Sequence, residues 1–133
     1  MKKILIVEDD ESFFTICSAA LKLKDYDVIH VSDGSQAVQV ISEQMPDIIL
    51  LDIVLPGMSG LDILQNIKET EELKSIKVVM LTNFGTDTNV NRAMELGAED
   101  YIMKYNVVPT ELADKVAVYL GDSSASSVNM VGE

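Results

Sequence analysis

The sequence contains a single cysteine, Cys17, and only 10 lysine and arginine residues among 133. One cysteine excludes an intramolecular disulfide and a thiolate metal cage, and small secreted domains usually need such cross-links. We therefore expect a cytoplasmic location. With 22 acidic residues the formal net charge is -12. This charge argues against direct binding to nucleic acid or to a membrane, because both attract clustered basic side chains.

Long apolar runs are also missing. The N-terminal run Ile4–Val7 ends at Glu8, well short of the roughly 7–15 residues of a signal-peptide core. No run approaches the length of about 20 residues that crosses a bilayer. The composition is 47% hydrophobic, which is enough for one globular core.

Short apolar runs rich in β-branched residues alternate with segments of helical periodicity. Such runs are typical of strands buried on both faces of a parallel sheet. The second helical face runs from Ala37 to Met45 and is stopped by Pro46, Gly97 ends the fourth helix, and Pro109 begins the fifth. Five strands alternating with five helices predict a doubly wound α/β sandwich with right-handed crossovers. The predicted strands are Ile4–Val7, Val28–Val31, Ile48–Leu51, Val78–Leu81 and Tyr101–Met103.

The composition changes after Leu120 to a small, polar stretch that begins Gly121-Asp122-Ser123. Such a stretch is poor in helix formers and lacks apolar periodicity. We expect one folded domain over residues 1–120 and a flexible C-terminal tail, or a truncated linker, over residues 121–133.

Polar residues stand at the ends of four predicted strands. Ligands bind outside the carboxyl ends of an open parallel sheet, where the strand order reverses. If the first and third strands are neighbours, their ends lie about 4.8 Å apart, which gathers Glu8, Asp9 and Asp52. These carboxylates repel one another unless a cation lies among them, and oxygen-only ligands favour Mg²⁺, with Mn²⁺ as a substitute. The formal charges of the three carboxylates, Mg²⁺ and Lys104 sum to zero. Such a site favours an incoming phosphoryl group.

These segments resemble the receiver domains of bacterial two-component response regulators, including the chemotaxis regulators, over roughly residues 1–120. The resemblance is carried by ILIVEDD at 4–10, DIILLDIVLPGMSG at 47–60, VMLT at 79–82 and YIMK at 101–104. It implies a flavodoxin-like (βα)5 sandwich with the parallel strand order 2-1-3-4-5. It also implies that Asp52 is the phosphoacceptor, and that Glu8, Asp9, Asp52 and the backbone carbonyl of Val54 hold Mg²⁺.

The same resemblance implies how the phosphoryl group is read. Thr82 would hydrogen-bond to it and Lys104 would pair with it. Tyr101 would turn into the space that Thr82 vacates and alter the surface of the fourth helix, fifth strand and fifth helix. Such a switch biases an equilibrium between two existing arrangements.

The implied partners follow from this chemistry. A histidine kinase or a phosphotransfer protein would donate the phosphoryl group, and a downstream protein effector or a linked output domain would respond. A dimer that forms on phosphorylation is a further expectation. The domain would catalyse only its own phosphorylation and dephosphorylation, so it would not be an enzyme in the usual sense.

Each residue also has an ordinary structural interpretation, and other functional classes share parts of the pattern. An aspartate after a strand usually caps a turn or helix. A phosphatase of the haloacid-dehalogenase type needs a second aspartate two residues after Asp52, where Val54 stands. A flavodoxin-like electron carrier needs a phosphate loop that the first strand lacks. The intact acid, threonine and lysine set argues against a phosphorylation-independent docking module. We interpret His30 as a polar strand-end residue and Cys17 as helix core.

Three positions depart from the family pattern. Tyr105 follows Lys104 where receivers commonly have proline, which leaves the geometry of that peptide bond open. Asn83 stands where a small residue is usual, and Phe84 follows it. We hypothesise that Val54, Asn83 and Phe84 slow the attack of water on the phosphorylated protein.

Overall fold

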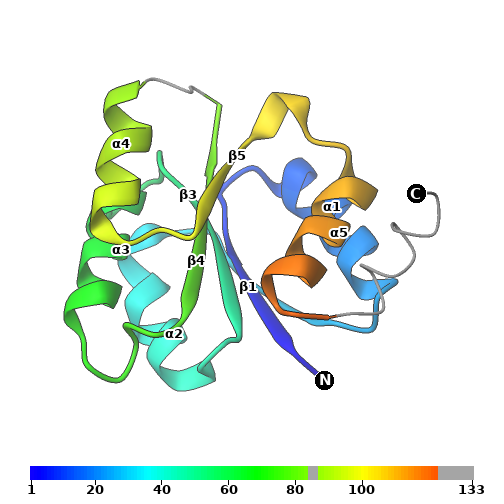
Figure 1. Cartoon of the computed structure of the whole chain (residues 1–133), viewed down its shortest axis with the longest axis horizontal. Helices are drawn as coiled ribbons and strands as arrows, with labels where there is room; N and C mark the ends of the chain where they lie inside the picture. Colours follow the sequence, from blue (N-terminus) through cyan, green and yellow to red (C-terminus); the bar gives the residue numbers. More distant parts are fainter. Residues whose placement is uncertain (84–86, 123–133) are drawn as a thin grey trace.

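Five parallel strands form one sheet in the order β2-β1-β3-β4-β5. The computed structural model describes residues 1–83 and 87–122, and Figure 1 shows the sheet between two layers of helices. The order confirms the predicted flavodoxin-like topology, and it places β1 beside β3 where the strand order reverses. The strands are β1 (Lys3–Val7), β2 (Asp27–Val31), β3 (Ile48–Asp52), β4 (Lys77–Thr82) and β5 (Asp100–Met103).

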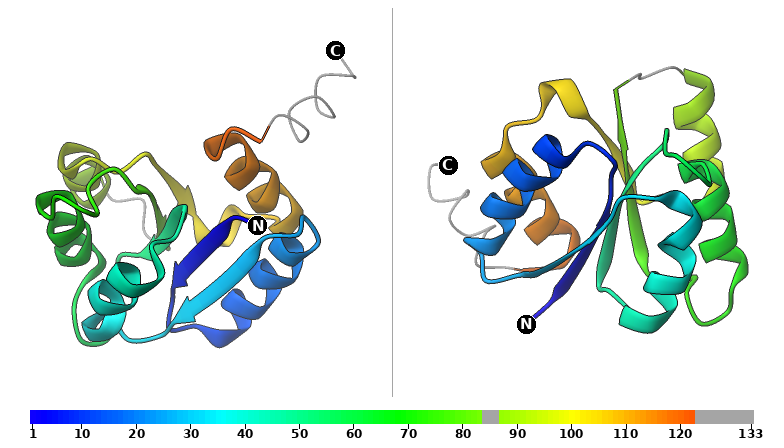
Figure 2. Two further views of the ribbon diagram at one scale, coloured as in Figure 1. Left: turned by 90° about the horizontal axis from the view of Figure 1, so that it is seen from below. Right: turned by 180° about the vertical axis from the view of Figure 1, so that it is seen from behind.

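Helices cover both faces of the sheet. One face carries α1 (Glu11–Lys22) and α5 (Pro109–Tyr119), and the other carries α2 (Ala37–Gln44), α3 (Gly60–Glu69) and α4 (Asp87–Leu96), as Figures 1 and 2 show. Two short 3-10 helices, η1 (Gly34–Gln36) and η2 (Lys104–Asn106), connect strands to helices. No helix among the described residues is long and apolar enough to cross a membrane.

The core is split by the sheet into two apolar clusters. Successive residues of a strand point to opposite faces, so Leu5 and Val7 join the cluster under α2, α3 and α4. Ile4 and Ile6 join the cluster under α1 and α5. All four side chains are fully buried. Because β1 is buried on both faces from Ile4 to Val7, these residues are continuously apolar and do not alternate between apolar and polar side chains.

Element boundaries differ from the prediction at several functional positions. Asp52 and Thr82 are the last residues of β3 and β4, whereas they were expected to follow these strands. The second helix ends at Gln44, and Met45 is a left-handed cap at φ 46°. The extension of this helix to Met45 was wrong, because Pro46 disfavours a helical conformation in the residue before it.

Other boundary predictions are confirmed. Gly97 has φ 106° directly after α4, and Pro109 opens α5. None of the peptide bonds that the structure describes is cis, so the bond between Lys104 and Tyr105 is trans. Phe84 and residues 123–133 of the expected tail lie outside the described residues.

The C-terminal end of α5 is held by hydrogen bonds from residues at the amino-terminal ends of the strands. The ammonium of Lys2 donates to the carbonyl of Leu120 at 3.0 Å, and that of Lys77 donates to the carbonyl of Tyr119. These lysines stand beside β1 and at the start of β4, so they satisfy carbonyls that the helix leaves unpaired.

The connection from β3 to α3 passes very close to β3 itself. The amide of Gly60 donates to the carbonyl of Ile53 at 2.8 Å. A Cβ atom at Gly60 would lie 2.0 Å from the carbonyl oxygen of Asp52, which no side chain can accept without a backbone shift. The missing side chain at Gly60 therefore sets how closely α3 approaches the end of β3.

We expect Gly60→Ala to lower the free energy of unfolding by about 2 kcal/mol or more, because the methyl group displaces backbone atoms. Urea denaturation followed by circular dichroism measures the change. Gly121→Ala is the matched control, since its Cβ meets nothing within 4 Å and only its φ of 75° opposes the change. That strain costs about 1 kcal/mol. Equal losses in the two variants would contradict the close approach.

Candidate functional site

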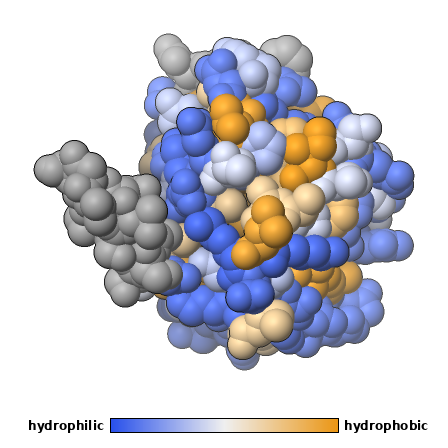
Figure 3. Space-filling model, turned by 90° about the vertical axis from the view of Figure 1, so that its right-hand side faces the viewer, coloured by the Kyte–Doolittle hydropathy of each residue, from blue (hydrophilic) through white to orange (hydrophobic). Residues whose placement is uncertain are grey.

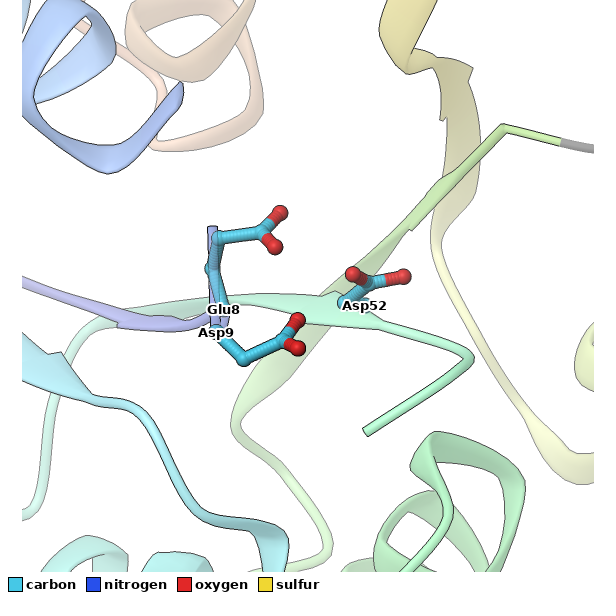
Figure 4. A group of neighbouring side chains, drawn as sticks. All are labelled: Glu8, Asp9 and Asp52. Carbon is cyan, nitrogen blue, oxygen red and sulfur yellow. The ribbon is translucent and has the colours of Figure 1, made fainter. Parts of the chain in front are cut away.

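Three carboxylates meet at the carboxyl edge of the sheet, where β1 and β3 end. Glu8 and Asp9 directly follow β1, and Asp52 ends β3. One oxygen from each lies within 4.8 Å of the others, and Figure 4 shows the side chains converging from the two neighbouring strands. Glu8 and Asp52 are buried, whereas Asp9 is exposed. The cluster is thus closed on the protein side and open to solvent at Asp9.

The ammonium of Lys104 lies among these carboxylates. Its Nζ is 2.7 Å from Oε1 of Glu8 and 3.2 Å from Oδ2 of Asp52. The lysine side chain is only 7% exposed, and Nζ also lies 4.9 Å from the centroid of the Phe13 ring. Together they carry a formal charge of -2 when all four groups are ionised, which matches a divalent cation.

Glu8 makes three hydrogen bonds in addition to the ion pair of its Oε1 with Lys104. Its Oε2 accepts from the amide of Asp10 at 2.9 Å, and its own amide donates to the carbonyl of Val31 at 2.9 Å. Its carbonyl accepts from Nε2 of His30 at 2.8 Å. Burial raises the pKa of the Glu8 carboxyl to about 7, against the lowering effect of Lys104 and of the Asp10 amide.

An open cavity of about 290 Å³ gives access to Asp52. Thr82 is buried in its wall at the end of β4, whereas Asn83 and Val54 are exposed at its rim. The amide of Val54 donates to Oδ1 of Asp52 at 3.3 Å, which leaves Oδ2 facing Lys104. The cavity is lined by Asp9, Asp10, Asp52, Val54, Thr82, Asn83 and Lys104.

Tyr101 lies apart from this cavity. It is 39% exposed on β5 and belongs to the lining of a separate groove between β5 and α5. In the sheet Met103, two residues further along β5, is the partner of Thr82. Of the predicted site residues, only Tyr101 therefore belongs neither to the carboxylate cluster nor to the lining of the cavity.

Two residues without a predicted role, Phe13 and His30, contact the site. Phe13 lies under the ammonium of Lys104, and the ring of His30 stacks on Phe14 with centroids 3.8 Å apart. His30 lies within β2 and is half-buried, so it is not simply a polar strand end. The sequence signal for these contacts was the pair Phe13-Phe14, which lies in the first turn of α1, just after the acidic residues.

Cys17 is buried in α1, as predicted, and burial raises the pKa of its thiol to about 11. The Glu8 carboxylate raises it further, while Lys104 opposes the shift. At neutral pH the thiol is therefore protonated and a poor nucleophile.

Sequence and structure comparisons identify the arrangement. The family described as "Response regulator receiver domain" matches residues 4–117. The chain belongs to this receiver domain family. The family predicted from the four sequence segments is thereby confirmed.

Receiver domains of known proteins share both sequence and fold with this one. It is 36% identical over 129 residues to the phosphate regulon transcriptional regulatory protein PhoB of Pseudomonas aeruginosa, over 93% of this chain and 56% of PhoB. The chain thus spans about half the length of the curated relatives it matches. The BeF3-activated N-terminal receiver domain of Klebsiella pneumoniae RstA shares 34% identity at a TM-score of 0.81, over 90% of this chain and 98% of that one. The Mn²⁺-bound form of the response regulator Rcp1 shares 28% identity at a TM-score of 0.80, over 90% and 94%.

This receiver domain is a signalling domain of the two-component type, and its family binds Mg²⁺ or Mn²⁺ at an acidic pocket. The donor set here fits such an ion, because every available ligand atom in the carboxylate cluster is oxygen. Two of the carboxylates are buried, and a cation offsets the cost of bringing them together.

We expect the metal-free receiver to lose stability as the pH rises through the window set by Glu8. Between the ordinary value of 4.5 and the raised pKa of about 7, the unfolded state has released a proton that the folded state retains. The free energy of unfolding therefore falls with pH, by up to about 3 kcal/mol for this group. Glu8→Gln removes the titration and should flatten the profile in that window.

Urea denaturation at pH 5 and pH 8 in the presence of a chelator measures this effect. Glu72→Gln is the matched control, because the Glu72 side chain is exposed and the substitution should leave the pH profile unchanged. An identical fall in the parent and in Glu8→Gln would show that Glu8 does not titrate as described.

Proposed function

We propose that this receiver domain accepts a phosphoryl group on Asp52, in a Mg²⁺-dependent step, from a histidine kinase or a phosphotransfer protein. The observation that carries the proposal is the position of the Asp52 carboxylate. It lies between two other carboxylates and the Lys104 ammonium, at the base of an open cavity. Phosphoryl transfer depends mainly on positioning and charge neutralisation, which this arrangement supplies.

Four groups would hold the metal. These are the carboxylates of Glu8 (directly or through water), Asp9 and Asp52, and the backbone carbonyl of Val54. When bound, Mg²⁺ supplies positive charge that offsets the charge of the transferred group, and Mn²⁺ would replace it. The Mn²⁺-bound form of Rcp1 supports this choice of ion.

Asp52 would act as the nucleophile. A bond forms between a carboxylate oxygen of Asp52 and phosphorus, and the bond between phosphorus and the imidazole nitrogen of the donor breaks. Both oxygens accept a hydrogen bond before transfer, Oδ1 from the Val54 amide and Oδ2 from the Lys104 ammonium. Lys104 would then leave Glu8 and pair with the phosphoryl oxygens, and Thr82 would hydrogen-bond to them.

The outward position of Tyr101 fits the unphosphorylated arrangement of the proposed switch. Movement of Thr82 toward the phosphoryl group would open space for Tyr101 behind it. The surface of α4, β5 and α5 would change as the ring turns inward. This surface includes the groove lined by Tyr101, Glu111 and Lys115, where a protein partner would sense the change.

The partners follow from the same scheme. Because PhoB is a transcriptional regulatory protein and extends well beyond the aligned part, we infer a linked output domain or a downstream protein effector. The acidic chain itself would not bind nucleic acid, and the face of α1 and α5 is largely hydrophilic with separate hydrophobic patches (Figure 3). We take residues 1–120 as the receiver and residues 121–133 as a tail or linker. A cytoplasmic location and a phosphorylation-dependent dimer complete the proposal.

We expect Asp52→Asn to abolish formation of an acyl phosphate from a small phosphodonor, because an amide oxygen is a far weaker nucleophile than a carboxylate. Intact-protein mass spectrometry after incubation with acetyl phosphate and Mg²⁺ measures the added phosphoryl group. Asp62→Asn is the matched control, since Asp62 is an exposed aspartate in the first turn of α3. Labelling of the Asp52→Asn protein at another residue would contradict the assignment of Asp52 as the phosphoacceptor.

The rim of the cavity sets the lifetime of the proposed acyl phosphate. We expect Val54→Asn to speed its hydrolysis about 2- to 10-fold, because a polar side chain there can orient water; a tenfold change corresponds to about 1.4 kcal/mol. Val118→Asn is the control, since Val118 is similarly exposed, at 52% against 65%, but lies on α5. Loss of the phosphoryl group from pulse-labelled protein gives the rates, and an unchanged or slower rate in Val54→Asn would contradict the hypothesis.

A further inference from the structure

His30 connects β2 to the backbone between two of the proposed metal ligands. We propose that His30 is a positioning residue for the metal site, fixing the peptide that joins Glu8 to Asp9 and so the direction of the Asp9 carboxylate. This inference rests on the proposed role of the acidic cluster in binding Mg²⁺. It concerns a residue that touches neither the metal nor the phosphoryl group.

In the hydrogen bond between His30 and Glu8, the imidazole must be the donor. Nε2 of the imidazole lies 2.8 Å from the carbonyl oxygen of Glu8, and a carbonyl can only accept. Nε2 of His30 therefore carries a proton. The Glu8 carbonyl and the Asp9 amide belong to one planar peptide, so the imidazole fixes the plane from which Asp9 extends.

Asp9 depends on this backbone support. Within residues 1–83 and 87–122 its carboxylate takes part in no hydrogen bond or ion pair, and the residue is exposed. Glu8, in contrast, has its carboxylate held by Lys104 and by the Asp10 amide. The direction of the Asp9 side chain is thus set chiefly by the peptide before it.

The imidazole is itself held in place. Its ring stacks on Phe14 of α1, with centroids 3.8 Å apart and planes 7° from parallel. The last carbonyl of β2, that of Val31, accepts the amide of Glu8 at 2.9 Å. The side chain of His30 then supplies the next donor, so β2 controls both the amide and the carbonyl of Glu8. Groups that orient metal ligands from outside are worth about 10- to 100-fold in affinity in other metal sites.

Two substitutions separate the hydrogen bond from the ring stack. His30→Phe keeps a ring against Phe14 but removes the donor, and His30→Gln keeps an N–H donor of similar reach but removes the ring. We expect His30→Phe to weaken Mg²⁺ binding about 3- to 10-fold, because one hydrogen bond that orients a ligand is lost. His30→Gln should stay within about twofold of the parent, because it restores that bond. Calorimetric titration of each metal-free chain with Mg²⁺ alone gives the affinities.

Val28→Ala is the control for a general weakening of β2. Val28 is half-buried on the same face of the strand and packs against the α1 and α5 cluster, without contacting Glu8. It should lower thermal stability while leaving Mg²⁺ affinity unchanged. Equal weakening of Mg²⁺ binding in Val28→Ala, or in His30→Gln as much as in His30→Phe, would overturn the proposal, because strand stability or packing would then explain the loss.

A measurement on the parent chain tests the inference without any variant. Long-range ¹H–¹⁵N NMR correlations of the imidazole report which nitrogen carries the proton, and we expect Nε2. A proton found only on Nδ1 would overturn the proposal even if His30→Phe failed to fold. Absence of Mg²⁺ binding by the folded parent would instead refute the proposed metal site, so the two failures are distinguishable.

Discussion

The buried contact of Lys104 with Glu8 and Asp52 is the interaction on which the site depends. It joins the end of β5 to the ends of β1 and β3, so one ammonium links three strands of the sheet. Removing these charges from water is costly, and their mutual attraction offsets that cost only while they remain paired. Without a metal, Lys104 is therefore the local counter-charge that lets the carboxylates lie together.

A cation bound at the acidic cluster would compete with Lys104 for the same carboxylates. Burial of Glu8 and exposure of Asp9 give the cluster an inner and an outer side. Gly60 holds α3 against the backbone of Asp52, and the β2 side chain of His30 holds the turn after β1. The Asp52 carboxylate thus stands on a strand, and the turn that carries Glu8 and Asp9 is held by contacts from its neighbours.

Much of this structure could be predicted from the sequence, because burial on both faces leaves a local signature. The apolar runs located every strand, and polar residues at their ends located Asp52, Thr82 and Lys104 at one edge. The contact of His30 with Glu8 could not be read in this way, because it depends on how β2, α1 and the turn after β1 pack together. The exposed position of Tyr101 was equally hidden, since an aromatic residue in a strand at the edge of the sheet can pack inward or lie outward.

The fastening of α5 by Lys2 and Lys77 fixes the position of the last described residues relative to the acidic cluster. Helix α5 begins near the carboxyl ends of the strands and ends near their amino ends, where both lysines donate hydrogen bonds to its final carbonyls. The last described residue, Asp122, accepts a hydrogen bond from the Tyr26 hydroxyl just before β2, so it lies at the edge of the sheet opposite the carboxylates. The Asp52 carboxylate and this edge are separated by the length of a five-residue strand, roughly 16 Å. The acidic cluster and the end of α5 therefore lie at opposite poles of the domain.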